Sequence, residues 1–394
     1  MAPPMSEPRT GRSSLAVLFL TVFLDLLGFG MIIPILPLYA ERLHASDLQT
    51  GLLLAIYSIM QLFFSPIWGR LSDRHGRRPV LLISILGSCV SQLGYAFAPT
   101  FIWLVVARGF AGVCGANVTA AQAYIADVTD ARSRAAGMGM LGAAFGLGFV
   151  FGPAIGGLLS QRSETLPFLV AGGLAAANFV LACFILKEPR SQAERTHART
   201  LTWDALLRTL SSPKLAVLIA LFFTVTFGFA NLEGTFSLYL TRQFHYGRRE
   251  TSYLFAYIGL IMVFVQGGMV RRLAPRFGER NLVITGTLFM GVGFFMLFHA
   301  TAVSMLFVAV AIVAVGNGLN GPSLSSLISR AAGNQQGGVL GVSQAFGALA
   351  RIVGPLIGTW ALAFGAPEPY LIGGVALLAA CAFAIAAVHQ PAAE

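Results

Sequence analysis

The chain has 394 residues, of which 56% are hydrophobic and only 11% are charged. Soluble globular domains carry about 25% charged residues, so this composition excludes an ordinary soluble domain and predicts a polytopic membrane protein. The net charge of +10 does not require nucleic acid as a partner, because the basic residues lie mostly in short segments between apolar runs. We therefore expect membrane lipids, and no nucleic acid, as partners.

Twelve apolar segments are long enough to cross a bilayer as helices, which takes about 20 residues each. They predict an all-α fold of twelve transmembrane helices in two six-helix bundles. We expect an N-terminal bundle over residues 1–187, a polar cytoplasmic linker over 188–212 and a C-terminal bundle over 213–394. The predicted spans are residues 15–40, 48–68, 79–98, 101–126, 134–160, 166–187, 213–241, 251–271, 281–300, 303–329, 337–363 and 369–389.

The distribution of Lys and Arg predicts the orientation. With the N-terminus in the cytoplasm, 19 of the 26 basic residues fall on the cytoplasmic side and five fall in the outer connections. Positive residues accumulate in cytoplasmic loops, so we expect both termini in the cytoplasm and the spans in the inner (plasma) membrane of a cell. The five outer exceptions are Arg42, Arg162, Arg242, Arg248 and Arg249.

Two charged residues lie inside predicted spans of the first bundle. Asp25 is about 15 Å along the first span, close to the middle of the bilayer. A carboxylate there is costly, so it is a candidate functional group that can bind and release protons. Arg108 in the fourth span needs a counter-charge, for which Asp25 is a candidate. The alternative for both is a purely structural role as buried polar partners.

The segment Gly69–Leu81 reads G-R-L-S-D-R-H-G-R-R-P-V-L and joins the second and third spans. It holds one acid, two glycines and four arginines, so it must lie at a membrane surface. The arginines alone are also explained by the positive-inside rule. The complete pattern, with the acid and the glycines, is more specific than the arginines alone.

The fifth predicted span contains G-F-V-F-G-P-A-I-G-G from Gly148 to Gly157. Glycines at 148, 152 and 156 share one helix face, where small residues let another helix approach closely. Pro153 removes one backbone hydrogen bond and can kink the helix. Helix packing is therefore one role that we expect for this motif.

Further polar residues in the spans are candidates for the lining of a cavity. Glu233 in the seventh span can bind a cation or a proton, or can be a rim residue with no coupling role. Arg351 in the eleventh span can form part of a polar cavity or anchor the helix near the cytoplasmic side. We also predict weak substrate contacts for Asn117, Asn231 and Asn320, although most such residues make hydrogen bonds between helices.

An internal repeat relates the two halves of the chain. Leu18–Val22 recurs as Leu221–Val225 at an offset of 203 residues, and Gly152–Gly156 recurs as Gly354–Gly358 at an offset of 202. The D-R-H-G-R-R of the charged segment recurs in part as P-R-F-G-E-R from Pro275. Halves of the same topology, with a site between them near the midplane, are an architecture of secondary transporters.

These motifs resemble those of the major facilitator superfamily of transporters, and within it the drug:proton antiporters of the tetracycline and multidrug efflux branch. The resemblance implies proton coupling through Asp25 and Arg108, to which we add Glu233 as a candidate second coupling site, and an antiporter motif at Gly148, Gly152, Pro153, Gly156 and Gly157. It also implies a latch between the halves, made of Gly69, Asp73, Arg74, Gly76, Arg77, Arg78 and Asp127. Because Pro275 replaces the acid in the second half, we expect a weaker latch there.

The resemblance implies a monomer that exports small hydrophobic or cationic compounds by alternating access, uses the proton gradient and needs no cofactor or metal. Tetracycline exporters carry further acids in the third and ninth helices, where this chain has none, so we expect a broader range of hydrophobic drugs. A proton-coupled symporter or facilitator for a sugar or metabolite and a non-transporting sensor remain alternatives. No nucleotide-binding or nucleophile motif appears in the sequence, so we do not expect an enzyme.

Overall fold

The computed structural model describes residues 11–115, 120–121, 124–125, 134–186, 188, 209–332 and 336–387. Within these residues the chain is helical, which confirms the predicted fold class. In the first half the helices are α1 (Gly11–Ile32), α2 (Leu36–Arg42), α3 (Asp47–His75), α4 (Arg77–Ala96), α5 (Phe101–Cys114), α7 (Arg134–Ser160) and α8 (Leu166–Ile185). In the second they are α10 (Pro213–Phe244), α11 (Arg248–Phe264), α12 (Val270–Phe277), α13 (Glu279–Phe298), α14 (Val303–Ala331), α15 (Gln336–Ala361) and α16 (Glu368–Ala387).

Nine of the described helical segments are long and apolar enough to cross a membrane, and a tenth is counted when α1 and α2 form one span. These two helices meet at a bend of 42°. Pro34 lies at this break, where its ring cannot continue the helix. The helix α5 and the apolar part of α7 are shorter, and residues 126–133 between them lie outside the described part of the chain.

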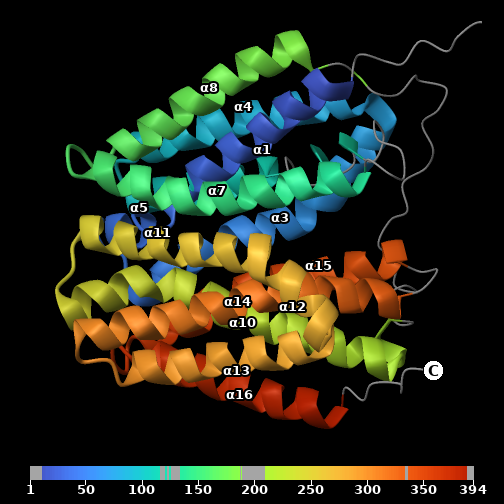
Figure 1. Cartoon of the computed structure of the whole chain (residues 1–394). Coiled ribbons are helices and arrows are strands. Elements are labelled where there is room, and N and C mark those ends of the chain that lie inside the picture. The colour runs from blue at the N-terminus through green and yellow to red at the C-terminus, as the bar shows by residue number, and fades with distance from the viewer. Residues whose placement is uncertain are drawn as a thin grey trace, which may run out of the picture.

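The helices form two bundles that lie side by side (Figure 1). The bundle of α1 to α8 meets the bundle of α10 to α16 mainly where α7 packs on α11 and where α3 packs on α15. We call the plane between the bundles the seam. The start of α1 and the end of α16 lie at the same end of the molecule, which we call the terminal end (Figure 1). The other end, which carries the connections near residues 43–46, 161–165 and 245–247, is the distal end.

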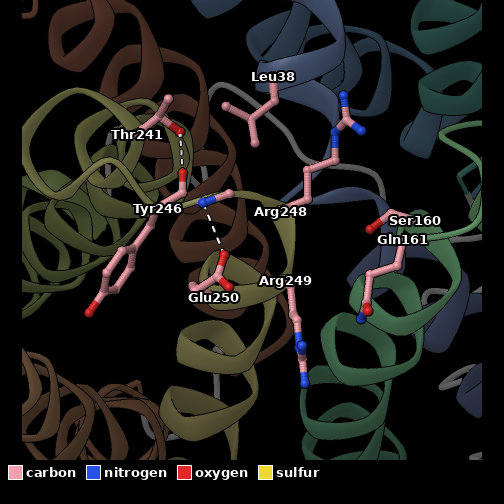
Figure 2. A pocket seen from close by; sticks show the side chains of 9 residues that line it. Leu38, Ser160, Gln161, Thr241, Tyr246, Arg248, Arg249 and Glu250 are labelled. Atoms are coloured by element: carbon pink, nitrogen blue, oxygen red, sulfur yellow. Dashed lines mark hydrogen bonds between the residues drawn. The ribbon is translucent and has the colours of Figure 1, made fainter.

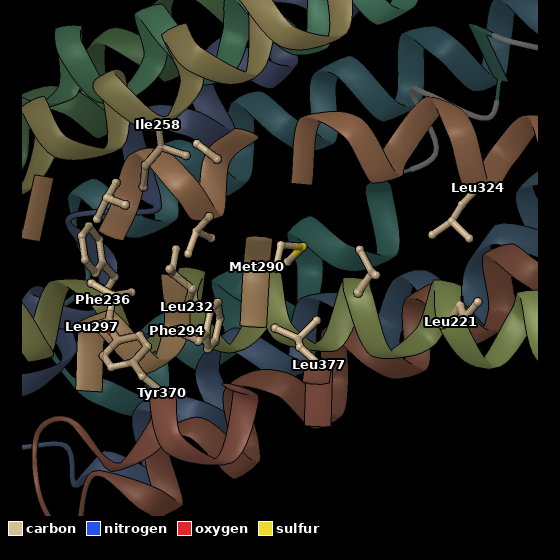
Figure 3. Packing of buried hydrophobic residues seen from close by; sticks show 14 of the residues in the cluster. Leu221, Leu232, Phe236, Ile258, Met290, Phe294, Leu297, Leu324, Tyr370 and Leu377 are labelled. Carbon is tan, nitrogen blue, oxygen red and sulfur yellow. The ribbon is translucent and has the colours of Figure 1, made fainter. Parts of the chain in front are cut away.

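Large apolar side chains fill the centre of the second bundle (Figure 3). Phe236, Phe294 and Tyr370 are fully buried there, and the rings of Tyr239 and Tyr370 meet edge to face with centroids 4.7 Å apart. Edge-to-face contacts of this kind add to the stabilisation from burial alone. A well-packed bundle of this kind can move as one body against its neighbour.

The predicted boundaries of the two bundles and the linker stay a prediction, because residues 189–208 lie outside the described residues.

Candidate functional site

Asp25 lies on α1 and faces α4 across the first bundle. The hydroxyl of Ser88 donates a hydrogen bond of 2.8 Å to its Oδ1 atom. The side chain of Tyr57 on α3 lies within electrostatic range of Asp25 and also of Arg108. Four helices, α1, α3, α4 and α5, therefore contribute side chains to the region of the bundle that holds Asp25 and Arg108.

Arg108 is held on an aromatic surface. Its guanidinium carbon lies 4.7 Å from the ring centre of Tyr57 and 5.5 Å from that of Phe29, and the residue is only 5% exposed. Cation–π contacts are strongest when the cation is shielded from water, as it is here. The Nε atom of Arg108 is buried and has no hydrogen-bond partner among the described residues.

Gly112 explains how α5 comes close enough for this contact. A Cβ atom at position 112 would overlap the carbonyl oxygen of Tyr57 and would lie 2.9 Å from the Cβ of Met60. Only glycine lets the backbones approach to this distance. Gly112, four residues after Arg108 on the same helix, therefore lets the guanidinium lie over the ring of Tyr57.

The second bundle supplies another acid and another basic residue near the seam. Glu233 on α10 lies within electrostatic range of Arg351 on α15 and of Arg108 across the seam. Arg351 in turn interacts with Tyr57 of the first bundle. The Oε1 atom of Glu233 is buried and has no hydrogen-bond partner among the described residues. Both arginines thus lie within electrostatic range of Glu233 and of Tyr57, and Asp25 lies within range of Tyr57.

The glycine motif of α7 packs directly against α1, within two turns of Asp25. A Cβ at position 152 would lie 2.8 Å from the carbonyl oxygen of Leu27 and 2.8 Å from the Cα of Gly30. A Cβ at position 156 would lie 2.7 Å from the carbonyl oxygen of Met31. These contacts explain the spacing of four residues and show that the motif fixes the position of α1.

Gly157 faces the other way and packs on α11 of the second bundle, where a Cβ would lie 2.7 Å from Ser252 Oγ. The repeat-related position on α15 is Thr359, which packs on Gly51 of α3. In the second pair the glycine lies on the opposite helix, so each of these two contacts across the seam has one glycine and one hydroxyl residue. Thr359 stands where the first bundle has Gly157, and Gly51 provides the space for its larger side chain.

The predicted latch segment turns at the start of α4. Gly76 has a φ of +108°, a conformation that favours glycine. Asp73 and Arg77 form an ion pair of 2.6 Å, and Arg77 Nη1 donates to Ser72 Oγ at 3.0 Å. Asp127, the third predicted member, lies outside the described residues.

Glu188 is a member of this cluster that we did not predict from the sequence. Its carboxylate accepts hydrogen bonds from the backbone nitrogens of Arg77, at 2.8 Å, and Arg78, at 3.0 Å. A carboxylate at a helix N-terminus satisfies free N–H groups and interacts favourably with the helix dipole. The acid that follows α8 therefore ties the start of the linker to the start of α4.

The equivalent turn of the second bundle holds an ion pair in place of the missing acid. Glu279 follows Gly278, which also has a positive φ of 78°, and pairs with Arg330 of α14 at 3.0 Å. Ser326 donates a further hydrogen bond of 2.7 Å to the same carboxylate. Pro275 does remove the expected acid, and Glu279 provides one from four residues further along.

Two of the residues predicted to contact substrate make hydrogen bonds between helices. Asn231 is fully buried and donates to the carbonyl oxygen of Pro369 on α16 at 3.0 Å. Asn320 is also fully buried and accepts a hydrogen bond of 3.2 Å from Thr287 on α13. Both amides join helices of the second bundle, and their contact with substrate stays a prediction. Asn117 lies outside the described residues.

A cavity of about 470 Å³ lies at the distal end of the seam (Figure 2). Both bundles line it, and its lining includes none of Asp25, Arg108, Glu233 and Arg351. Its lining residues are Leu38, Ser160, Gln161, Thr241, Tyr246, Gly247, Arg248, Arg249 and Glu250.

Comparisons with known proteins agree with this architecture. The family model described as "Major Facilitator Superfamily" matches residues 18–276 and 227–394. The class C tetracycline resistance protein of Escherichia coli is 33% identical over 88% of this chain and 89% of its own length. Multidrug resistance protein 1 of Bacillus subtilis (strain 168) is 27% identical over 95% of this chain and 96% of its own length.

Solved structures show the same fold. A crystal structure of the human organic anion transporter MFSD10 (TETRAN) has a TM-score of 0.73 at 26% identity and covers 96% of this chain and 100% of that one. A bacterial homologue of the human lysosomal transporter Spinster, in an inward-facing and occupied conformation, has a TM-score of 0.80 at 17% identity, with 97% of each chain covered. With two matched bundles and a family model over nearly its whole length, the chain belongs to the major facilitator superfamily and is a multi-pass membrane transporter.

Proposed function

We propose that this protein is a proton-coupled antiporter that exports small amphipathic compounds by alternating access. The observation that carries this proposal is the group of two acids and two arginines at the seam, together with the similarity to tetracycline and multidrug resistance proteins. In this proposal the membrane is the bacterial inner membrane and the terminal end faces the cytoplasm. The distal end then faces the outside.

The charge of the central group gives a mechanism for exchange. Asp25, Arg108, Glu233 and Arg351 have a formal charge of zero when both acids are ionised and of +2 when both are protonated. Protons that arrive from the outside therefore make the site repel a cationic substrate and remove its carboxylate partners. After the carrier turns inward, loss of the protons restores the acceptors and the affinity for substrate.

The aromatic surroundings of Arg108 suggest how the site binds a substrate. Arg108 lies on the rings of Phe29 and Tyr57, so it forms a fixed positive charge at Tyr57, which is also within electrostatic range of Asp25. The rings of Phe29, Tyr57 and Phe149 cluster, with centroids 5.6 Å and 6.3 Å apart. Flat apolar groups of a substrate can pack on such rings, while its polar groups meet the unpartnered atoms of Arg108 and Glu233. We infer a hydrophobic or cationic substrate of small size.

Transport of organic anions is a second candidate function, and it has its own support. The protonated site has two arginines and no ionised acid, so it attracts anions, and the similar human protein MFSD10 is an organic anion transporter. Such a substrate would move together with protons rather than against them. The direction of coupling separates the two candidates.

Inside-out vesicles test the proposal. Uptake of a fluorescent lipophilic cation should follow acidification of the vesicle interior and should be lost in Asp25→Asn. Glu368→Gln, which removes an acid at the start of α16, is the matched control and should transport normally. Proton-driven cation uptake that persists in Asp25→Asn would contradict the coupling role. Gradient-driven movement of a fluorescent organic anion out of the same vesicles, with no cation uptake, would favour the second candidate.

A further inference from the structure

Three of the five arginines that depart from the expected charge asymmetry take part in ion pairs at the distal end. Arg42 belongs to the first bundle, whereas Arg242 and Arg248 belong to the second. Their partners are all acids of the first bundle. The six residues, which we call the distal ion-pair cluster, are Glu41, Arg42, Asp47, Glu164, Arg242 and Arg248.

Arg242 forms the first connection across the seam. It lies in the last turn of α10 and reaches Asp47 in the first turn of α3, with Nη2–Oδ1 and Nη1–Oδ2 distances of 2.5 and 2.9 Å. Its Nη2 atom is also 3.2 Å from Glu41 Oε1. Two parallel bonds between a guanidinium and a carboxylate hold both groups in one geometry, which makes this pair stronger than a typical surface ion pair. The start of α3 is thereby fixed to the end of α10.

Glu164 forms the second connection, and it does so with one arginine from each bundle. Its carboxylate contacts Arg42 of its own bundle and Arg248 at the start of α11. The Glu164 side chain is only 15% exposed, so leaving it without a cation would be costly. If the bundles separate, Arg248 leaves and Arg42 can stay. The contact between Glu164 and Arg248 can therefore open without leaving the Glu164 carboxylate unpaired.

Uncharged contacts lie next to the cluster and close the seam beneath it. Ser237 of α10 donates a hydrogen bond of 3.0 Å to the carbonyl oxygen of Pro34, at the break between α1 and α2. Gly51 packs on Thr359 one turn along α3 from Asp47. The distal cavity borders Arg248, and Figure 2 shows that Arg248 and Arg249 leave the start of α11 in opposite directions. Arg249 instead lies 5.7 Å from the ring centre of Tyr253 on its own helix.

We propose that the distal ion-pair cluster is the closing device of the distal side: it stabilises the conformation in which the bundles touch there, and it must open once in each transport cycle. This inference concerns the movement of the bundles and holds for either candidate substrate. It assigns a role to outer arginines that the positive-inside rule disfavours.

The expected size of the effect follows from the number of pairs. One exposed ion pair shifts an equilibrium by about two- to fivefold. Glu164→Gln combined with Arg242→Gln removes both connections across the seam. We therefore expect about a tenfold increase in the ratio of distally open to distally closed molecules. The control is Arg249→Gln, which removes the outer arginine next to Arg248 that is not a member of the distal ion-pair cluster. This variant should leave the ratio unchanged.

Distances between spin labels at the two distal rims measure this ratio without any transport assay. Ser163 and Gln243 are exposed, lie at the distal end and belong to different bundles, so both are suitable positions. The labels require a parent protein in which the native thiols are replaced, namely Cys89, Cys114, Cys183 and Cys381. In the double variant the longer distance should gain population, and in Arg249→Gln the distribution should match that of the parent.

Ionic strength gives a second measurement that needs no further variant. Salt screens exposed ion pairs, so 1 M salt should raise the open fraction of the parent. The double variant, which has lost the pairs, should respond much less. An unchanged distance distribution in the double variant, or an equal response to salt in both proteins, would overturn the proposal. If the distances change as expected but the parent protein shows no proton-driven transport, the result would instead count against the proposed function alone.

Discussion

The contact between Gly51 and Thr359 corresponds to that between Ser252 and Gly157, with the glycine on the opposite helix. It leads to a specific prediction. An alanine at position 51 would place its Cβ 3.2 Å from the Cβ of Thr359 and 3.1 Å from the carbonyl oxygen of Pro355. Thr359 Oγ1 also lies in the way, and it donates to that same carbonyl oxygen at 2.8 Å, so it cannot rotate without losing a hydrogen bond. We therefore expect Gly51→Ala to push α3 and α15 apart.

The expected size comes from overpacking, which typically costs about 1–3 kcal/mol. Because this contact lies on the seam, the cost falls on the distally closed conformation. It corresponds to about a 5- to 150-fold shift towards the open conformation. Adding Thr359→Gly removes the opposing side chain and reproduces the arrangement of Gly157 against Ser252, so it should restore most of the parent behaviour.

Spin-label distances at the distal rims and transport rates in vesicles measure this double-mutant cycle. The matched control is Gly173→Ala on α8, where a new Cβ meets nothing within 4 Å. A normal distance distribution in Gly51→Ala, or a double variant as impaired as the single one, would refute the compensation between these two positions.

Three further predictions concern the charged residues. Glu188→Ala removes the acceptor for two N–H groups at the start of α4 and should lower the free energy of unfolding by about 1–2 kcal/mol, measured by thermal unfolding in detergent and compared with Glu368→Ala. Arg108→Lys keeps the charge but loses the planar contact with the aromatic rings, so transport should fall although the protein folds, as size-exclusion chromatography can verify. Glu279→Arg should impair transport through like charges beside Arg330, and Arg330→Glu should restore it in the double variant; no recovery would show that their pairing is unimportant.

The fold could be predicted from the sequence because each transmembrane span is indicated by neighbouring residues alone. A run of about 20 apolar residues predicts a span wherever it occurs, and the composition requires burial in lipid. Asp25 and Arg108 could be selected in the same way, because a charge inside such a run needs a specific reason. The glycines of the α7 motif were also visible, since their spacing repeats with the helix.

Contacts between distant segments could not be predicted in this way. Glu188 stands at the edge of a polar stretch, where an acid is ordinary, and only the fold brings it to the start of α4. Arg242 and Asp47 are 195 residues apart, and no sequence pattern around either residue indicates that they pair. The sequence of a span also does not distinguish a buried amide in a cavity from one in a helix contact, and only the fold shows that Asn231 donates to the carbonyl oxygen of Pro369.

The central claim is that substrate and protons compete for the charged group at the seam. The most direct test adds a transported lipophilic cation to purified protein in weakly buffered detergent solution and records proton release with a pH indicator. The account predicts release on binding in the parent and a clear reduction in Asp25→Asn and in Glu233→Gln. Binding of the cation without any proton release in the parent would contradict it.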